Sequence, residues 1–431
     1  MSKIGVFVSC ATGHLNPTIA LCRELKRRGH DVTFFGVADA LEKVTAAGLG
    51  YISLGEKDYP LGTTSLAARQ LGELSGNAAR RFTYRHLQRM AALSFEHGLP
   101  AVRESHIDLI LVDQIEPAGP TIANHLGVPY VTIATGGLTN REIGVPPITV
   151  GWAYGGGLWK AVRNRLGYAQ LDRETKTISK YVNQWRRRWK LPPYRTIDET
   201  LSPLAQLSQE PFEFEFPRQR LPQCVHFLGP FIDVSARKST PFPWNRLTGE
   251  PLVYVSMGTL QNRNARVFQC IAEACLGFSV QLVMSMGGGG LGLAELPGAP
   301  LIVDYAPQLG LLSKAALTIT HAGLNTVMEA LSRGVPMVAI PVASDQPGVA
   351  ARVARIGAGE VVPLCHLDGA RLRTSIERVL HNESFKQQAV RFQKLLRNYK
   401  GAAGAADVIE RVAVTGRAVD WEPPLYRSAA A

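Results

Sequence analysis

The chain repeats one pattern: a continuous apolar run, a short loop and a segment with helical periodicity. The first copy leads from Ile4–Ser9, IGVFVS, through a helix to a second apolar run, DVTFF. Runs that are apolar on both faces are typical of strands in parallel sheets that helices cover on both sides. A strand, a helix and a strand in succession form a βαβ unit, so we expect an α/β fold. The helix is predicted to have Asn16 as its N-cap and Pro17 at its first position, and to end before Gly29.

The pattern falls into two series. In the first, apolar runs at 108–113 and 129–134 flank a helix predicted over 117–126. The second series contains the runs PLVYVSMG, SVQLVMS, PLIVDYAP, ALTIT, PMVAIP and GEVVPL. A chain of 431 residues suits two domains. We predict an N-terminal domain at 1–228, a linker rich in proline, serine and charge at 229–250, a C-terminal domain at 251–415 and a tail at 416–431. In two such domains the carboxyl ends of the strands face one cleft, where ligands bind.

A helical, basic insertion is predicted at about 136–200. Eleven Lys or Arg residues and two carboxylates lie between Trp159 and Arg195, so this segment carries +9 of the net charge of +12. Within it, Ile178, Val182, Trp185 and Trp189 recur at helical spacing. One interpretation is a peripheral helix that contacts an anionic membrane through 159–195; the other is a helix that packs this stripe on the N-terminal domain. Charge confined to one segment, without a known motif, does not indicate nucleic-acid binding.

Other features exclude further classes of protein. No run of 18 apolar residues occurs, and the first residues, MSKIGVFVSC, lead directly into a strand, so a cytoplasmic location is predicted. The six cysteines are scattered without a CxxC pair, which favours reduced thiols and no metal site. The glycine-rich run Gly287–Leu293 lacks the spacing of a dinucleotide-binding loop and is predicted to border the cleft as a loop.

His321 directly follows the apolar run ALTIT and precedes a helix predicted over 326–333. The free N–H groups of a helix N-terminus bind anions, and Gly323 would let a phosphate approach the backbone. A histidine at this place can donate a further hydrogen bond to the phosphate. The alternative is a core histidine that is bonded to a carbonyl group.

Polar residues after His321 suit a sugar nucleotide. Thr326 and Glu329 fit a helix-capping box, but a carboxylate here can equally accept hydrogen bonds from both hydroxyls of a ribose. Asp345 and Gln346 follow the run PMVAIP and suit the hydroxyls of a sugar, with helix capping as the alternative.

A second histidine, His14, lies in the segment GHLNP after the first apolar run, and Asp113 ends the run LILVD. A histidine with a carboxylate behind it is a general base whose tautomer and charge are set by that partner. Both residues are expected at the carboxyl ends of strands. Chain order alone does not establish that they touch.

The block Tyr305–Gln346 resembles the nucleotide-sugar signature of the inverting UDP-glycosyltransferases with the GT-B fold. It shares APQ after an aromatic residue, THxGxNT, a Glu eight residues after the His, GVPM and the final Asp-Gln pair, and GHLNP matches the position of the family's base. The resemblance implies two Rossmann-like parallel-sheet domains that face each other across a cleft. It also implies a UDP-sugar donor and no metal or other cofactor.

Residue roles follow from the resemblance by position. His14 would be the general base and Asp113 its orienting partner. The donor would be bound by Tyr305 on the uracil, Gln308 and Glu329 at the nucleoside and ribose, Thr259, His321, Gly323, Asn325 and Thr326 around the diphosphate, and Asp345 and Gln346 at the sugar. Tyr305 and Leu324 stand where many plant members have Trp, which leaves the base and sugar of the donor open.

Three further segments, VDQIEPAG at 112–119, LSPLAQLSQ at 201–209 and SMGTLQ at 256–261, are similar to the bacterial zeaxanthin glucosyltransferases of this family. The resemblance implies inverting transfer of a sugar, glucose, to a hydroxyl of a lipophilic acceptor, a hydroxylated carotenoid such as zeaxanthin. The alternatives are a sterol or a polyketide or macrolide alcohol as the acceptor, and a GT-B-type UDP-sugar epimerase.

Overall fold

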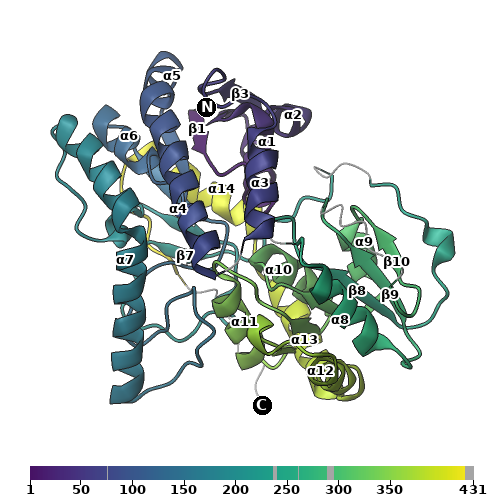
Figure 1. The fold of residues 1–431 in the computed structure, drawn as a ribbon. Helices are drawn as coiled ribbons and strands as arrows, with labels where there is room; N and C mark the ends of the chain where they lie inside the picture. The colour runs from purple at the N-terminus through teal and green to yellow at the C-terminus, as the bar shows by residue number, and fades with distance from the viewer. Residues whose placement is uncertain (75, 236–239, 261, 289–295, 423–431) are drawn as a thin grey trace.

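The computed structural model contains two parallel β-sheets, each covered by helices (Figure 1). It describes residues 1–74, 76–235, 240–260, 262–288 and 296–422. The first sheet has the strand order β3-β2-β1-β4-β5-β6-β7, and the second has the order β10-β9-β8-β11-β12-β13. The expected α/β fold with two Rossmann-like sheets is confirmed. Of the glycine-rich run predicted to be a loop, residues 289–293 lie outside the described part of the chain.

The N-terminal sheet is built from short buried strands. They are β1 (Lys3–Phe7), β2 (Asp31–Gly36), β3 (Gly50–Ser53), β4 (Leu109–Asp113), β5 (Tyr130–Ala134), β6 (Gln206–Ser208) and β7 (Val225–Phe227). Its helices are α1 (Thr12–Arg27), α2 (Leu41–Ala46), α3 (Thr63–Glu73), α4 (Gly76–Leu93), α5 (Leu99–Glu104), α6 (Gly119–Leu126) and α7 (Leu158–Arg188). Every residue of β4 and β5 is buried, as their continuous apolar sequences predict.

The C-terminal sheet follows the second predicted series. Its strands are β8 (Leu252–Ser256), β9 (Gln281–Ser285), β10 (Leu301–Val303), β11 (Ala315–Thr320), β12 (Met337–Ala339) and β13 (Gly359–Val361). Its helices are α8 (Ala265–Cys275), α9 (Gln308–Leu312), α10 (Leu324–Ser332), α11 (Gln346–Arg355), α12 (Gly369–His381) and α13 (Glu383–Leu396). In each sheet the strand order reverses beside the first strand, and such switch points are where ligands bind in parallel sheets.

The end of the chain returns to the N-terminal sheet. Helix α14 (Gly401–Thr415) packs against α1 and buries Ala405, Ile409 and Val412 in the core beneath β1. Val419 is also buried there, and its N–H donates to the carbonyl oxygen of Leu204. The division of the chain at 228, 250 and 415 stays a proposal based on chain order, while by packing α14 lies with the first sheet.

Helix α1 begins one turn before the predicted start. Its first residue is Thr12, so Asn16 is not the N-cap and Pro17 lies inside the helix. Because proline has no N–H, Pro17 leaves the carbonyl oxygen of Gly13 without its donor within the helix. The side-chain amide of Asn325, from α10, donates to this oxygen instead. This tertiary contact satisfies the Gly13 carbonyl oxygen and so allows the helix to begin at Thr12.

The apolar stripe of α7 faces the protein core. Ile178 and Val182 are buried, and the Trp185 ring stacks on Phe95 with centroids 5.0 Å apart. Trp189 stacks on His125 at 4.5 Å. The packing interpretation is therefore confirmed for this stripe, because its side chains pack on Phe95 and His125 of the N-terminal domain. Contact of the remainder of 159–195 with a membrane stays a prediction. In the described part of the chain, no helix is both long and apolar enough to cross a bilayer.

Candidate active site

The switch points of the two sheets bring the predicted residues to the strand ends. In the first sheet, β1 neighbours β4, so His14 in α1 lies beside Asp113 at the end of β4. In the second sheet, β8 neighbours β11, which places Thr259 and His321 at adjacent strand ends. A direct hydrogen bond joins the two regions, since the side-chain amide of Asn325 in α10 donates to the carbonyl oxygen of Gly13 in α1. The candidate active site lies between the sheets at these strand ends.

His14 is held by a carboxylate and a hydroxyl. Its Nδ1 lies 2.6 Å from Asp113 Oδ2 and 2.6 Å from Thr135 Oγ1. Thr135 also donates to Asp113 Oδ2 at 3.1 Å, and the backbone N–H of Ile115 donates to Oδ1 at 3.2 Å. Because an ionised carboxylate only accepts hydrogen bonds, Nδ1 carries the hydrogen and Nε2 keeps its lone pair.

The surroundings of His14 favour its protonation. Burial alone would lower the pKa of His14, but the charge and hydrogen bond of Asp113, with the charge of Asp345, raise it above its ordinary value. The side chain of Asp113 is 0% exposed, whereas that of His14 is 24% exposed. The carboxylate is therefore sealed from solvent, while the imidazole is partly exposed. This arrangement suits a group that takes up a proton during a reaction.

His321 lies in a tight turn that requires glycine on both sides of its ring. A Cβ atom added to Gly258 would lie 2.7 Å from His321 Nε2, and one added to Gly323 would lie 2.5 Å from it. Nδ1 lies 3.4 Å from the Ser256 carbonyl oxygen and 3.4 Å from Thr320 Oγ1. Burial lowers the pKa of His321, although the Ser256 bond and the charge of Asp345 oppose it. The ring is therefore neutral at pH 7, and a bound diphosphate would favour its protonated form.

The N-terminus of α10 points its free N–H groups to the same turn. The helix begins at Leu324, with Gly323 as its N-cap, and not at residue 326 as predicted. Thr326 is thus its third residue, and the capping box proposed for Thr326 and Glu329 is not formed. The earlier start places the helix N-terminus directly beside His321, as an anion site requires.

Replacing Gly323 with Ala tests whether this turn holds the donor. Gly323 has an ordinary φ of −62°, so the added Cβ acts mainly through its contact with the His321 ring. Overpacking of about 1–3 kcal/mol predicts UDP binding about 5- to 150-fold weaker, measured by titration calorimetry. Gly369→Ala is the matched control, because its Cβ would meet nothing within 4 Å. Unchanged affinity for UDP would separate this turn from the donor site.

Glu329 and Gln308 form one hydrogen-bonded group. Gln308 Nε2 donates to Glu329 Oε2 at 2.7 Å, and the Tyr254 hydroxyl donates to Gln308 Oε1 at 3.2 Å. Tyr305 lies three residues before Gln308, and its side chain is 57% exposed, so its ring is free to stack on a base. A Cβ on Gly288 would lie 2.3 Å from the Tyr305 hydroxyl, which shows how closely the two loops approach.

Asp345 and Gln346 make different contacts. Asp345 Oδ2 accepts a hydrogen bond of 3.0 Å from the backbone N–H of Gly137, in the loop after β5. The Asp345 side chain does not cap α11. Gln346 Oε1 accepts from the N–H groups of Val342 and Ala343 at 2.8 and 3.0 Å. Asp345 thus bridges the two sheets. The side-chain oxygen of Gln346 orders its own loop, and its NH₂ group can donate to a ligand.

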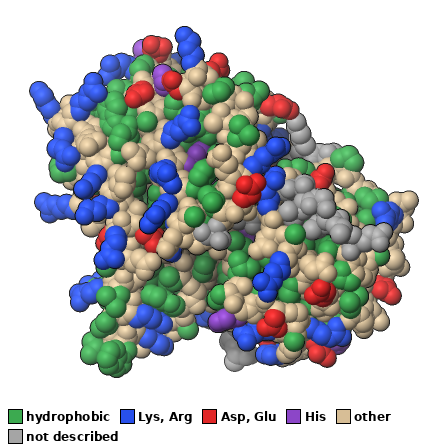
Figure 2. Space-filling model, in the orientation of Figure 1, with side chains coloured by type: hydrophobic (Ala, Val, Ile, Leu, Met, Phe, Trp, Pro, Cys, Tyr) green, Lys and Arg blue, Asp and Glu red, His purple; other side chains and the backbone are tan. Residues whose placement is uncertain are grey.

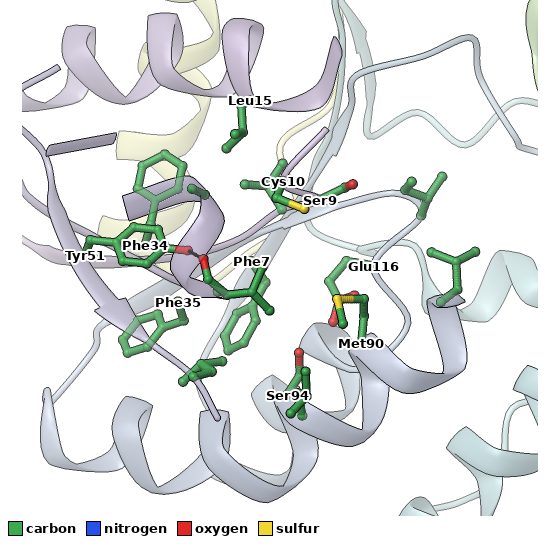
Figure 3. Close-up of a pocket in the computed structure, with 18 of the residues that line it drawn as sticks. Phe7, Ser9, Cys10, Leu15, Phe34, Phe35, Tyr51, Met90, Ser94 and Glu116 are labelled. Atoms are coloured by element: carbon green, nitrogen blue, oxygen red, sulfur yellow. Dashed lines mark hydrogen bonds between the residues drawn. The ribbon is translucent and has the colours of Figure 1, made fainter. Parts of the chain in front are cut away.

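An apolar pocket opens beside the first strand end (Figure 3). Its volume is about 60 Å³, and its walls come from β1, β2 and α4. Phe7, Phe34, Leu15 and Met90 supply apolar surface, but at this volume the end group of a ligand would enter only if side chains such as the adaptable Met90 moved.

Glu116 is the one carboxyl group among the described residues that line this mainly apolar pocket. Burial, together with the charge of Asp113, raises the pKa of Glu116 to about 7. Hydrogen bonds from Ala118, Ser94 and Gly119 lower this pKa but do not offset the rise. Near pH 7 this side chain is therefore partly protonated, and it can both donate and accept a hydrogen bond.

Sequence reasoning missed three side chains of the site: Thr135, Glu116 and Asn262. Thr135 lies just past β5, the neighbour of β4, so its place next to the end of β4 was available from the order of the strands. Asn262 is buried and donates to the carbonyls of Gly258, Met286 and Gly287. These hydrogen bonds join two loops that are distant in the sequence, so no local sequence pattern predicts them.

Residues 77–399 match the model of the family described as UDP-glucoronosyl and UDP-glucosyl transferase. The chain is 31% identical over 432 residues to the zeaxanthin glucosyltransferase of Pantoea ananas, covering 97% of this chain and 98% of that one. It is 30% identical over 434 residues to the zeaxanthin glucosyltransferase of Pseudescherichia vulneris, covering 95% and 98%. Among solved structures, the glycotransferase of kitacinnamycin superposes with a TM-score of 0.74 at 22% identity, covering 95% of this chain and 97% of that one. These likenesses confirm the GT-B fold.

Proposed function

The chain belongs to the UDP-glucoronosyl and UDP-glucosyl transferase family, and on this premise we propose that it transfers glucose from UDP-glucose to a hydroxyl of a hydroxylated carotenoid such as zeaxanthin. It is a glycosyltransferase; the donor, the acceptor and the inverting course are the proposal. The observation that carries the proposal is His14, which is backed by Asp113 and partly exposed, in a helix that Asn325 joins to the N-terminus of α10.

His14 is the general base of the proposed reaction. Its Nε2 removes the proton from the acceptor hydroxyl as the acceptor oxygen attacks the anomeric carbon from the face opposite the diphosphate. The bond between that carbon and the diphosphate oxygen breaks, and UDP leaves with the bonding electrons. The configuration is inverted once, so the α-linked donor gives a β-glucoside. Asp113 stabilises the imidazolium that forms and holds the ring in position.

The donor is proposed to lie against the C-terminal sheet. Tyr305 would stack on uracil, and Gln308 and Glu329 would bind the nucleoside. Charge that develops on the leaving UDP would be stabilised by Thr259, His321, Gly323, Asn325, Thr326 and the N-terminus of α10. Fixed donors of this kind supply the stabilisation without a metal ion. Asp345 and Gln346 are the proposed contacts of the sugar, and the hydrogen bond of Asp345 to Gly137 would then be exchanged or shared.

The acceptor is proposed from the two relatives that are named zeaxanthin glucosyltransferase, each matched over almost its whole length. The apolar pocket beside β1 agrees with a lipophilic acceptor, because most of its lining is hydrocarbon. Glu116 would supply a polar contact within it, as a hydroxylated end group requires.

The experiment that tests the function is incubation with UDP-glucose and zeaxanthin in detergent micelles, with EDTA present. We expect a more polar coloured product that carries a β-linked glucose, and undiminished turnover in EDTA. Reactions without acceptor, with a sterol, with a macrolide alcohol and with dTDP-glucose run in parallel.

Each control isolates one part of the proposal. A new sugar nucleotide in the absence of acceptor would identify an epimerase. Turnover of only the sterol or macrolide would refute the carotenoid acceptor, a preference for dTDP-glucose would refute the donor, and strict dependence on Mg²⁺ would contradict the role given to α10.

A further inference from the structure

The first turns of α7 carry an exposed apolar cluster, here named the α7 tip, which consists of Leu158, Trp159, Val162 and Leu166. Leu158 and Trp159 are 80% and 85% exposed. The spacings of three and four residues place the cluster on one helical face, opposite the stripe of Ile178 and Val182 that packs on the core. Contiguous apolar surface of this kind marks a site of interaction.

An arginine-rich groove continues from the α7 tip. It runs between α4 and α7, has a volume of about 990 Å³ and is here named the arginine groove. Arg80, Arg81 and Arg85 from α4 and Arg173 from α7 line it, and Leu166 of the α7 tip lies in its wall. Glu174 is the one carboxylate among the described residues of the lining, and it pairs with Arg80 at 3.4 Å. Figure 2 shows the apolar cluster at the lower left and basic side chains along the edge above it.

We infer that the α7 tip and the arginine groove bind the surface of an anionic lipid bilayer. Tryptophan and leucine side chains enter the boundary between headgroups and acyl chains, and neighbouring arginines contact the lipid phosphates. Charge complementarity selects this partner, because four arginines and one carboxylate line the groove that Leu166 of the apolar cluster also lines. This surface differs from the Trp185 and Trp189 stripe, which is packed on the core.

Helix α4 connects the membrane surface to the apolar pocket. His86, Leu87 and Met90 line the pocket, whereas Arg81 and Arg85 line the arginine groove. At 3.6 residues per turn these sets occupy nearly opposite faces of the helix. A bilayer bound at the groove is therefore separated from the pocket by about one helix diameter, roughly 10–12 Å. Membrane binding goes beyond the proposed function, since it holds whatever sugar or acceptor is used.

Flotation of the full-length chain with vesicles tests the inference. We expect the protein to float with phosphatidylcholine vesicles that contain phosphatidylglycerol, to stay at the bottom with phosphatidylcholine alone, and to be released by salt. Replacing Leu158, Trp159 and Leu166 with Ser should weaken binding at least about tenfold, because each side chain loses its burial in the bilayer. Replacing Arg81, Arg85 and Arg173 with Gln should weaken it about fivefold for each arginine.

Matched controls come from exposed residues elsewhere. Leu276→Ser with Val414→Ser removes exposed apolar side chains from other elements, and Arg371→Gln with Arg391→Gln removes charge from α12 and α13. Both pairs should leave vesicle binding within about twofold of the unchanged chain. Quenching of Trp159 fluorescence by brominated lipid, lost in Trp159→Phe, shows that this residue enters the bilayer.

Three results would overturn the inference. One is equal flotation with neutral vesicles, and another is unchanged binding by the Leu158, Trp159 and Leu166 variant. The third is a dimer in sedimentation that this variant converts to monomer while vesicles are not bound. Turnover measured in detergent micelles does not require a bilayer, so failure of the proposed function and failure of membrane binding are distinguishable.

Discussion

Replacing His14 with Ala should lower kcat by about 10²- to 10⁴-fold, the range that a positioned general base contributes. The reason is that no other described side chain combines a free imidazole nitrogen with the buried carboxylate of Asp113 at this strand end. Binding of UDP should persist, because the proposed donor contacts come from the other sheet. Initial rates and titration calorimetry measure the two effects. His366→Ala removes an exposed histidine and serves as the control.

The pH dependence of this reaction provides a second test of His14 as the general base. Because His14 acts as a base only when it is neutral, kcat/KM should rise with pH through a midpoint above the ordinary value of 6.5, as its raised pKa requires. Burial lowers the pKa of His14 and Asp113 more than offsets it, so Asp113→Asn should move the midpoint to lower pH and also reduce the rate. Thr135→Val should reduce the rate by less. Full turnover by the His14 variant, or a pH midpoint that does not change in Asp113→Asn, would show that another group is the general base.

The second large effect is expected at the contact between the sheets. Arg352 in α11 donates to Glu215 Oε1 at 2.5 Å, and both side chains are 1% exposed. Burial alone would raise the pKa of Glu215, but the charges of Arg352 and Arg218 lower it. Arg352→Ala leaves the Glu215 carboxylate buried without its nearest cation, which should cost about 3–5 kcal/mol of unfolding free energy. Urea denaturation followed by fluorescence measures the loss.

Two variants show whether the loss comes from burial of the ion pair. Arg378→Ala removes an ion pair of similar length, 2.8 Å to Glu360, but the arginine is 60% exposed, so less than about 1 kcal/mol should be lost. Combining Arg352→Met with Glu215→Gln removes both charges and should recover part of the stability. Equal losses for Arg352→Ala and Arg378→Ala would contradict the argument.

Strands with long apolar sequences were predictable, and short polar ones were not. β4 and β5 are continuous apolar runs that stay buried on both faces, so their sequences alone indicate a parallel sheet. β6 and β7, with sequences QLS and VHF, have three residues each and were not predicted. The equally short β10, β12 and β13 lie in longer apolar runs that were recognised, whereas polar residues interrupt the sequences around β6 and β7.

For the candidate site, too, the sequence predicted the positions of strand ends but not the contacts between distant segments. Strand ends could be located from the sequence, so His14 and Asp113 were each expected at one, whereas their pairing was implied only by the family resemblance. The start of α1 was misplaced because Pro17 normally marks a first helical turn, and the contact that allows an earlier start comes from Asn325 in the other sheet. The packing of the α7 stripe at Trp185 was left open because periodicity identifies an apolar face without identifying what covers it.

The hydrogen bond from Asn325 to Gly13 has a consequence for the evolution of this enzyme. It ties the helix that carries His14 to the helix that would face the leaving group, and neither partner belongs to the apolar pocket. The spacing between base and leaving group is thus set independently of the acceptor. Under the proposed function, substitutions around Phe34 and Met90 would exchange one acceptor for another while this spacing is inherited unchanged.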